Sequence, residues 1–118
     1  MVNDVKQKVL LPTLRENQRY LVYELILTLK SKNFKSAHDQ IIDECQKMLG
    51  IFDGAKAGLQ SAKFEETTSR GIIRVNSRYV DKLKVCLGLI KNINNQPASI
   101  NCLYVSGLLN KAKEKLKD

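Results

Sequence analysis

The chain has 118 residues, 43% of them hydrophobic and 27% charged, and its 20 Lys and Arg outnumber its 12 Asp and Glu to give a formal net charge of +8. This length favours a single domain with one core, and the charge favours an anionic partner, with nucleic acid as the leading class. Export and membrane insertion are not supported, because the N-terminus lacks a signal-peptide core and no apolar run reaches 18 residues, so we expect a cytoplasmic protein.

The chain is expected to begin with an N-terminal arm over residues 1–18, which lies on the surface or is ordered only by a partner. Neither helical nor strand periodicity is sustained there, and Pro12 interrupts the segment. Residues 19–118 are then expected to form one domain. Its first element is a buried strand over residues 19–29, a stretch rich in aromatic and branched side chains.

A helix and a hairpin are predicted next. Apolar side chains recur at helical spacing over residues 34–49, and Gly50 supplies a stop, after which residues 51–58 have room for one further helical turn. Residues 59–66 and 70–77 are short strands on either side of a polar turn, which is the pattern of a β-hairpin.

The second main helix is predicted to follow the hairpin directly, with Ser77 as its N-cap. Residues 94–99 have the composition of a turn, residues 100–106 predict a strand, and the final stretch "LLNKAKEKLKD" predicts a short helix. The order β-α-β-β-α-β indicates an α+β, ferredoxin-like or RRM-like sandwich, with a four-stranded antiparallel sheet, two helices on one face and an extra C-terminal helix. The apolar face of the second helix is traced by Val80, Leu83, Cys86, Leu87 and Ile90.

The stretch "SRGIIRVNSR" places three arginines on one face of the predicted third strand, because side chains alternate between faces. Successive arginines lie about 13 Å apart, further than the Debye length of roughly 10 Å at 0.1 M salt, so each is expected to act as a separate phosphate clamp. Two alternatives stay open. Arg74 can pair with Glu24 of the neighbouring first strand, and Arg78 can lie in the first turn of the next helix.

No catalytic motif of the serine-hydrolase, zinc-protease, P-loop or dinucleotide-binding type occurs in the chain. An RRM stacks bases on aromatic side chains of its first and third strands, but the third strand here has none, and Tyr20 and Tyr23 of the first point to opposite faces. RNA would therefore be contacted through its phosphates and shape. The residues predicted to contact RNA are Arg15, Arg19, Lys63, Arg70, Arg74, Arg78, Lys111 and Lys113.

The first strand is apolar on both faces, although two helices can cover only one face of the sheet. We expect the C-terminal helix to cover part of the second face through Leu108, Leu109, Ala112 and Leu116, and a protein partner to cover the rest. Cys45, Cys86 and Cys102 each fall in an apolar pattern and are expected to be buried and unpaired. The residues predicted to form a protein interface are Tyr20, Val22, Ile26 and Leu109.

Four stretches together resemble one family: "LPTLRENQRYLVYELI" at 11–26, "LGIFDGAKAGLQ" at 49–60, "RGIIRVN" at 70–76 and "YVSGLLNKAK" at 104–113. They are similar to the small RRM-like protein subunit of archaeal and eukaryotic ribonuclease P, called protein component 2 in archaea. The resemblance covers nearly the whole chain in the right order.

The resemblance implies a place in the ribonucleoprotein that removes the 5′ leader from precursor tRNA. The RNA subunit would perform the hydrolysis with bound Mg²⁺, and this chain would bind no cofactor and supply no catalytic residue. Its protein partner would be the TIM-barrel-like subunit of the same enzyme, in a two-plus-two assembly. The alternative is a ferredoxin-like protein-interaction module whose basic charge is incidental.

Overall fold

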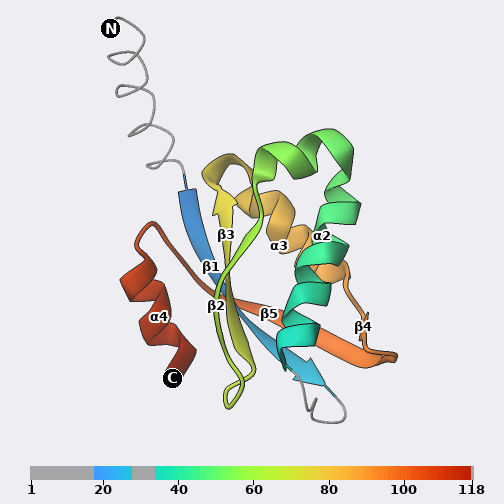
Figure 1. Ribbon diagram of the computed structural model, residues 1–118, viewed down its shortest axis with the longest axis vertical. Helices are drawn as coiled ribbons and strands as arrows, with labels where there is room; N and C mark the ends of the chain where they lie inside the picture. The colour runs from blue at the N-terminus through green and yellow to red at the C-terminus, as the bar shows by residue number, and fades with distance from the viewer. Residues whose placement is uncertain (1–17, 28–33, 118) are drawn as a thin grey trace, which may run out of the picture.

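The structure is a computed structural model that describes residues 18–27 and 34–117. Residues 1–17 of the arm predicted over 1–18 lie outside the described part, and Gln18 belongs to the first strand. Helices pack against both faces of one sheet (Figure 1). The elements are β1 (Gln18–Leu27), α2 (Phe34–Ala57), β2 (Gln60–Glu65), β3 (Arg70–Asn76), the short 3-10 helix η1 (Ser77–Tyr79), α3 (Val80–Leu89), β4 (Asn92–Ile93), β5 (Gln96–Ser106) and α4 (Leu109–Lys117).

The strands are ordered β2-β3-β1-β5-β4 in the sheet, and all of the paired neighbours run antiparallel. The first four strands of this series confirm the predicted ferredoxin-like arrangement. The fifth strand was not predicted. Asn94 and Asn95 both have positive φ, 54° and 63°, which is the conformation of a two-residue type I′ hairpin loop. The stretch read as a turn therefore contains a tight hairpin, and β5 begins at Gln96 rather than at residue 100.

Helix α2 is bent where the sequence predicted a stop. Gly50 has φ 85° and ψ −177°, so the backbone leaves the helical conformation there and resumes it for the residues up to Ala57. Gly58, with φ 59°, follows the helix in the left-handed conformation that commonly ends one. The predicted further helical turn is thus confirmed, as a second segment that points away from the first.

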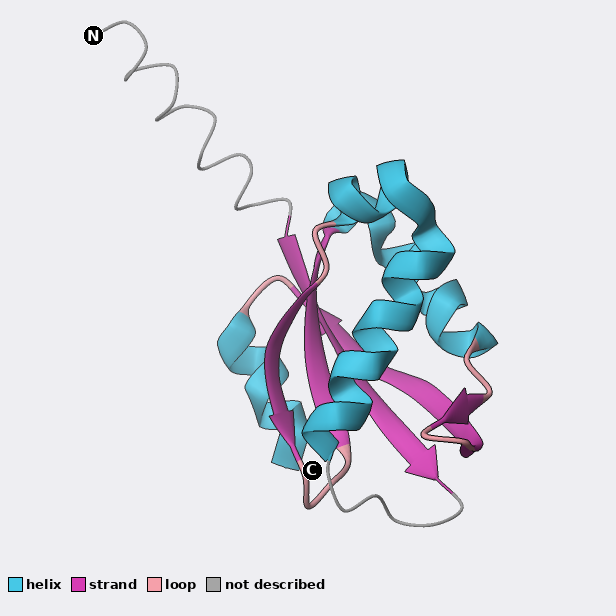
Figure 2. Ribbon diagram, turned by 45° about the vertical axis from the view of Figure 1, so that its right-hand side comes forward, coloured by secondary structure: helices cyan, strands magenta, loops and turns pink. Residues whose placement is uncertain are grey.

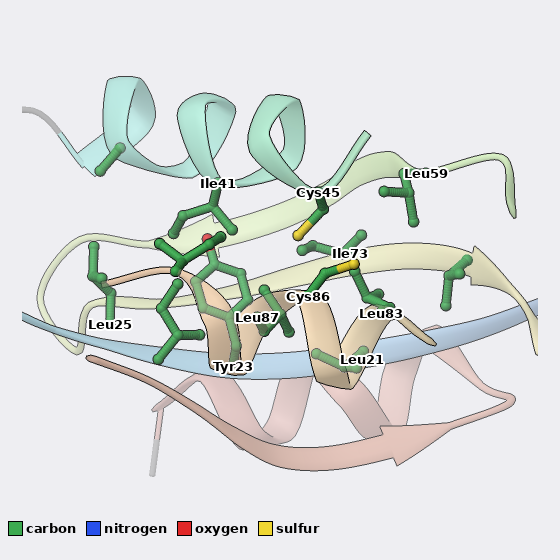
Figure 3. Close-up of a cluster of buried hydrophobic side chains, with 14 of the residues drawn as sticks. Leu21, Tyr23, Leu25, Ile41, Cys45, Leu59, Ile73, Leu83, Cys86 and Leu87 are labelled. Carbon is green, nitrogen blue, oxygen red and sulfur yellow. The ribbon is translucent and has the colours of Figure 1, made fainter. Parts of the chain in front are cut away.

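Helices α2 and α3 cover one face of the sheet, and side chains of β1, β3 and both helices form the main core. Figure 3 shows Ile41 and Cys45 of α2 pointing towards Tyr23 and Ile73 of the sheet. The buried side chains of α3 are Leu83, Cys86 and Leu87, which confirms its predicted apolar face.

Helix α4 packs on the opposite face of the sheet, and Figures 1 and 2 both place it across the sheet from α2. Beneath it, Val22 of β1 and Ile72 of β3 meet Ala112 and Leu116 in a second apolar cluster. The predicted cover by the C-terminal helix is thereby confirmed. One residue differs, because Leu108 precedes the helix and is 60% exposed.

The cysteine prediction is confirmed for two residues and wrong for one. Cys45 and Cys86 are buried, whereas Cys102 is exposed, and all three are unpaired. Cys102 lies on β5, where Ile100 alone is buried among the strand's eleven residues. Beyond β5 the sheet continues only as the two-residue β4, so little of the fold covers this strand.

Candidate nucleic-acid and protein interfaces

Arg70 and Arg74 lie on the α4 face of β3, as alternation predicts, but among the described residues only Arg70 forms an ion pair or hydrogen bond. Its Nε lies 3.7 Å from Glu24 Oε2, and its Nη1 donates a 2.8 Å hydrogen bond to the carbonyl oxygen of Lys115 in α4. The β1–β3 register sets Glu24 opposite Arg70 and Tyr20 opposite Arg74. The alternative in which Glu24 pairs with Arg74 is therefore wrong. Arg70 pairs with Glu24 instead, and it connects β3 to β1 and to the end of α4.

Arg74 is surrounded differently. Within residues 18–27 and 34–117 it makes no ion pair or hydrogen bond, and its Nε, like that of Arg70, is buried without an acceptor. It lies opposite Tyr20 of β1 and opposite Gln60 of β2, in the row of residues that crosses three strands. These side chains line a pocket of about 250 Å³, which is completed by Ser61, Ala62 and Leu109.

Arg78 does not continue the row. Strand β3 ends at Asn76, and Arg78 is an exposed residue of η1. The Asn76 side chain accepts a 3.0 Å hydrogen bond from the backbone N–H of Arg78. Asn76 is therefore the cap at this point rather than the predicted Ser77, and Arg78 takes the helical alternative that the sequence left open.

The remaining basic candidates lie at several places. Lys63 and Lys113 meet at a groove of about 420 Å³ between β2 and α4, together with Lys117, Glu65 and Glu114. Lys111 is exposed on α4. Arg19 donates a hydrogen bond from Nη1 to the carbonyl oxygen of Gln18. Arg15 lies outside the described residues.

The predicted protein-interface residues differ in accessibility. Val22 is fully buried beneath α4, and Tyr20 and Leu109 pack against the same cluster while partly exposed. Ile26 is 49% exposed and lies beside Pro97 and Ser99 at the far end of β1. A partner on this face can therefore reach Ile26, Tyr20 and Leu109, whereas the fold of the chain itself covers Val22.

The helix side carries an apolar surface that the sequence interpretation missed. Ile51 and Phe52, which follow the bend at Gly50, are 86% and 80% exposed. A groove of about 390 Å³ runs beside Met48, Val85 and Leu89. At its rim Lys82 Nζ lies 3.0 Å from Asp53 Oδ2. The adjacent apolar pair directly after a helix-stopping glycine was the available signal. We call Met48, Ile51, Phe52, Val85 and Leu89 the helix-side patch.

A polar network in the main core was also not predicted. His38 is fully buried, and one ring nitrogen contacts the Tyr23 hydroxyl while the other lies 2.8 Å from Ser61 Oγ. A neutral ring can accept from one hydroxyl and donate to the other, so both nitrogens are satisfied. Burial lowers the pKa of His38 and raises that of Tyr23, so both stay uncharged near neutral pH.

Gly71 makes room for this network. A Cβ at this position would lie 2.6 Å from Tyr23 Oη and 2.8 Å from His38 Nδ1. The glycine of the "RGIIRV" stretch is therefore required by close packing. It reaches the network from the face of β3 opposite to Arg70 and Arg74.

Within the described ranges, no group of three or more His, Cys, Asp or Glu side chains is placed to hold a metal ion. None of the helices in residues 34–117 is long and apolar enough to cross a membrane.

Comparison with known proteins assigns the chain to a family. The model of the Rpp14/Pop5 family matches residues 19–117. Ribonuclease P protein component 2 of Pyrococcus furiosus is 36% identical over 110 residues, which cover 93% of this chain and 91% of that protein. The protein of the same name from Thermococcus gammatolerans is 35% identical, with 93% and 91% covered.

A solved structure agrees on the fold. A chain in the cryo-EM structure of yeast ribonuclease MRP superposes with a TM-score of 0.55 at 13% identity, covering 86% of this chain and 87% of that one. The resemblance noted in the sequence is confirmed by the matched residues and by the relatives. The chain belongs to the Rpp14/Pop5 family.

Proposed function

We propose that this chain is a non-catalytic, RNA-associated subunit of ribonuclease P, and that it braces the RNA that removes the 5′ leader from precursor tRNA. The observation that carries the assignment is the family match, which runs through residues 19–117 and leaves no element of the described fold outside it. Relatives named ribonuclease P protein component 2 align with the chain over about nine-tenths of their length. The chain is thus a protein subunit of ribonuclease P.

The proposed RNA contacts are cationic. Arg74 has an unpartnered buried Nε within the described part of the chain, and Lys63 and Lys113 flank a separate groove between β2 and the C-terminal half of α4. Such groups bind phosphate oxygens and position RNA without taking part in bond cleavage. The chemistry, with its Mg²⁺, is assigned to the RNA subunit, and this chain is proposed to bind no cofactor.

The proposed protein partner is the TIM-barrel-like subunit of the same enzyme, in a two-plus-two assembly. The support is the helix-side patch, where Ile51 and Phe52 are exposed next to an apolar groove. Contiguous exposed apolar surface on a small domain commonly marks a protein contact. Ile26, at the other side of the sheet, is a second apolar position open to a partner.

The assignment is tested by affinity purification of the tagged full-length chain from its native cells. We expect a stable RNA and the partner protein to co-purify, and the eluate to remove the 5′ leader from precursor tRNA. Digestion with micrococcal nuclease, followed by chelation of its Ca²⁺, should abolish this activity, because the RNA performs the reaction. Activity that survives the digestion would overturn the assignment of the chemistry to RNA. Protein partners without any RNA would favour the protein-interaction module instead.

A further inference from the structure

Helix α4 leaves one end of its sheet face open. The cluster beneath the helix is built on Val22 and Ile72, which pair across β1 and β3. Tyr20 and Arg74 form the next pair of this ladder on the same face. Gln60 of β2 lies opposite Arg74 on its other side. This row crosses three adjacent strands just ahead of Leu109, the first residue of α4. The open end therefore presents an aromatic ring, a guanidinium and an amide side by side.

Among residues 18–27 and 34–117, the guanidinium of Arg74 has no acceptor. At the equivalent point under the other end of α4, Arg70 has both Glu24 and the Lys115 carbonyl oxygen. No carboxylate is among the described residues that line the Arg74 pocket. Burying an unpaired N–H of a charged group is costly, which favours an anion from outside the chain at this position.

The rest of the pocket indicates what kind of anion fits. A carboxylate or a free phosphate would use Arg74 alone, whereas a nucleotide also offers a flat base and a hydroxyl-bearing ribose. Tyr20 supplies a ring on which a base can stack, and the Gln60 amide can both donate and accept hydrogen bonds. The opening of about 250 Å³ lies on the sheet surface and has one aromatic, enough for one base.

We propose that this pocket binds a single unpaired nucleotide of RNA, with its phosphate on Arg74 and its base against Tyr20. The proposal rests on the RNA association argued above and adds the structural class of the ligand. It also refines the sequence interpretation. The pair of base-stacking strands of an RRM is absent, but a single aromatic side chain, Tyr20, lies in the pocket where one base can stack on it. Sequence discrimination is not expected, since every base offers a stacking face.

The test uses the purified full-length chain and two probes labelled with a fluorophore, a ten-nucleotide oligouridylate and a fully paired RNA hairpin with a short loop. Tyr20→Leu keeps apolar contact with the α4 cluster but removes the ring. It should weaken oligouridylate binding about five- to one-hundredfold and change hairpin binding by less than about twofold. Arg74→Ala should weaken oligouridylate binding and flatten the slope of log K against log salt by about 0.7.

Lys35→Ala is the control, because it removes one positive charge at an exposed position of α2, on the opposite face of the sheet from the pocket. In this control background, Tyr20→Leu should still weaken oligouridylate binding more than hairpin binding. Equal losses on both probes for Tyr20→Leu would overturn the unpaired nucleotide. A second result would also overturn it. If a glutamate-rich peptide competed with the RNA, and this competition required Arg74 but not Tyr20, the pocket would be assigned to a carboxylate.

A second measurement does not depend on the variants folding. An oligouridylate that contains 4-thiouridine should cross-link under long-wavelength light to the tryptic peptide that begins at Tyr20. Cross-links confined to other peptides would contradict the proposal. The two proposals can fail separately. If leader removal by the purified ribonucleoprotein still requires its RNA while neither measurement implicates Tyr20, the nucleotide-binding proposal is wrong and the subunit assignment stands.

Discussion

Arg70 and Arg74 are the same residue type on the same face of the same strand, but they differ in what surrounds them. Arg70 forms an ion pair with a carboxylate and donates a hydrogen bond from Nη1 to a helix carbonyl oxygen, whereas Arg74 makes neither contact in the described part of the chain. The Nε of both arginines is buried without a hydrogen-bond acceptor among the described residues. The difference comes from α4, whose C-terminal end reaches Arg70 while its first residue borders the Arg74 pocket. An arginine stripe in a sequence thus contains at least two kinds of residue, one that braces the fold and one that is open to a ligand.

The largest effect is expected from the opposite face of β3, where Gly71 packs against the His38 network. Gly71→Ala should destabilise the protein by about 2–4 kcal/mol, because the added Cβ displaces Tyr23 and His38 and breaks their contact. Urea unfolding measures this free energy. Gly88→Ala is the control, since open space surrounds that helical position and alanine favours helix there by up to about 1 kcal/mol. Similar destabilisation by the two substitutions would contradict the packing role of Gly71.

The comparison between the arginines is tested directly by removing each one. Arg70→Ala should cost about 1–2 kcal/mol of unfolding free energy, because Glu24 and the Lys115 carbonyl oxygen lose their partner. Arg74→Ala should change stability by less than about 0.5 kcal/mol, or raise it, because no internal partner is lost in the described structure. Thermal and urea unfolding of the two variants provide the measurement. If Arg74→Ala proved the more destabilising of the two, the division of roles would be reversed.

A pH effect of intermediate size is expected from His38, the chain's single histidine. Burial lowers its pKa in the folded state below the ordinary value of 6.5, so the unfolded chain binds the proton more readily. Its contribution to stability is therefore complete above pH 6.5 and declines as the pH falls towards the folded-state pKa, by at most about 1.4 kcal/mol per pH unit.

Urea unfolding between pH 7.5 and 5.5 measures this decline, in a range where most carboxylates keep their charge. His38→Gln should lose stability at every pH and should also lose most of the slope. A slope that persists unchanged in that variant would assign the pH dependence to other groups.

The smallest effect on stability is expected at the helix-side patch, which no described element covers. The double substitution Ile51→Ser and Phe52→Ser should change the free energy of unfolding by less than about 0.5 kcal/mol, because both side chains are already in water. We expect the isolated chain to self-associate through this exposed apolar surface, and the double substitution should reduce that association, measured by sedimentation velocity. Leu108→Ser removes an exposed leucine outside the patch and should leave association unchanged. Equal effects of the two variants would argue against a specific contact surface.

The sequence by itself determined the order of the elements and the faces of their side chains. Apolar spacing predicted α2 and α3, and alternation correctly placed Arg70, Ile72 and Arg74 on one face of β3. The apolar residues of the C-terminal stretch predicted the helix that covers the second sheet face. These features follow from local periodicity, which a few neighbouring residues define without help from the rest of the chain.

Only the tertiary structure decided which residues meet. Arg70 and Arg74 are four positions apart, so a register shift of four residues would exchange the partner of Glu24 and keep every side chain on its face. The hydrophobic pattern is the same in both registers and cannot choose between them, whereas the packed sheet and α4 do. The same reason accounts for the contact of His38 with Tyr23, for the space left at Gly71 and for the exposure of Cys102. Each depends on segments that are distant in sequence and adjacent only after folding.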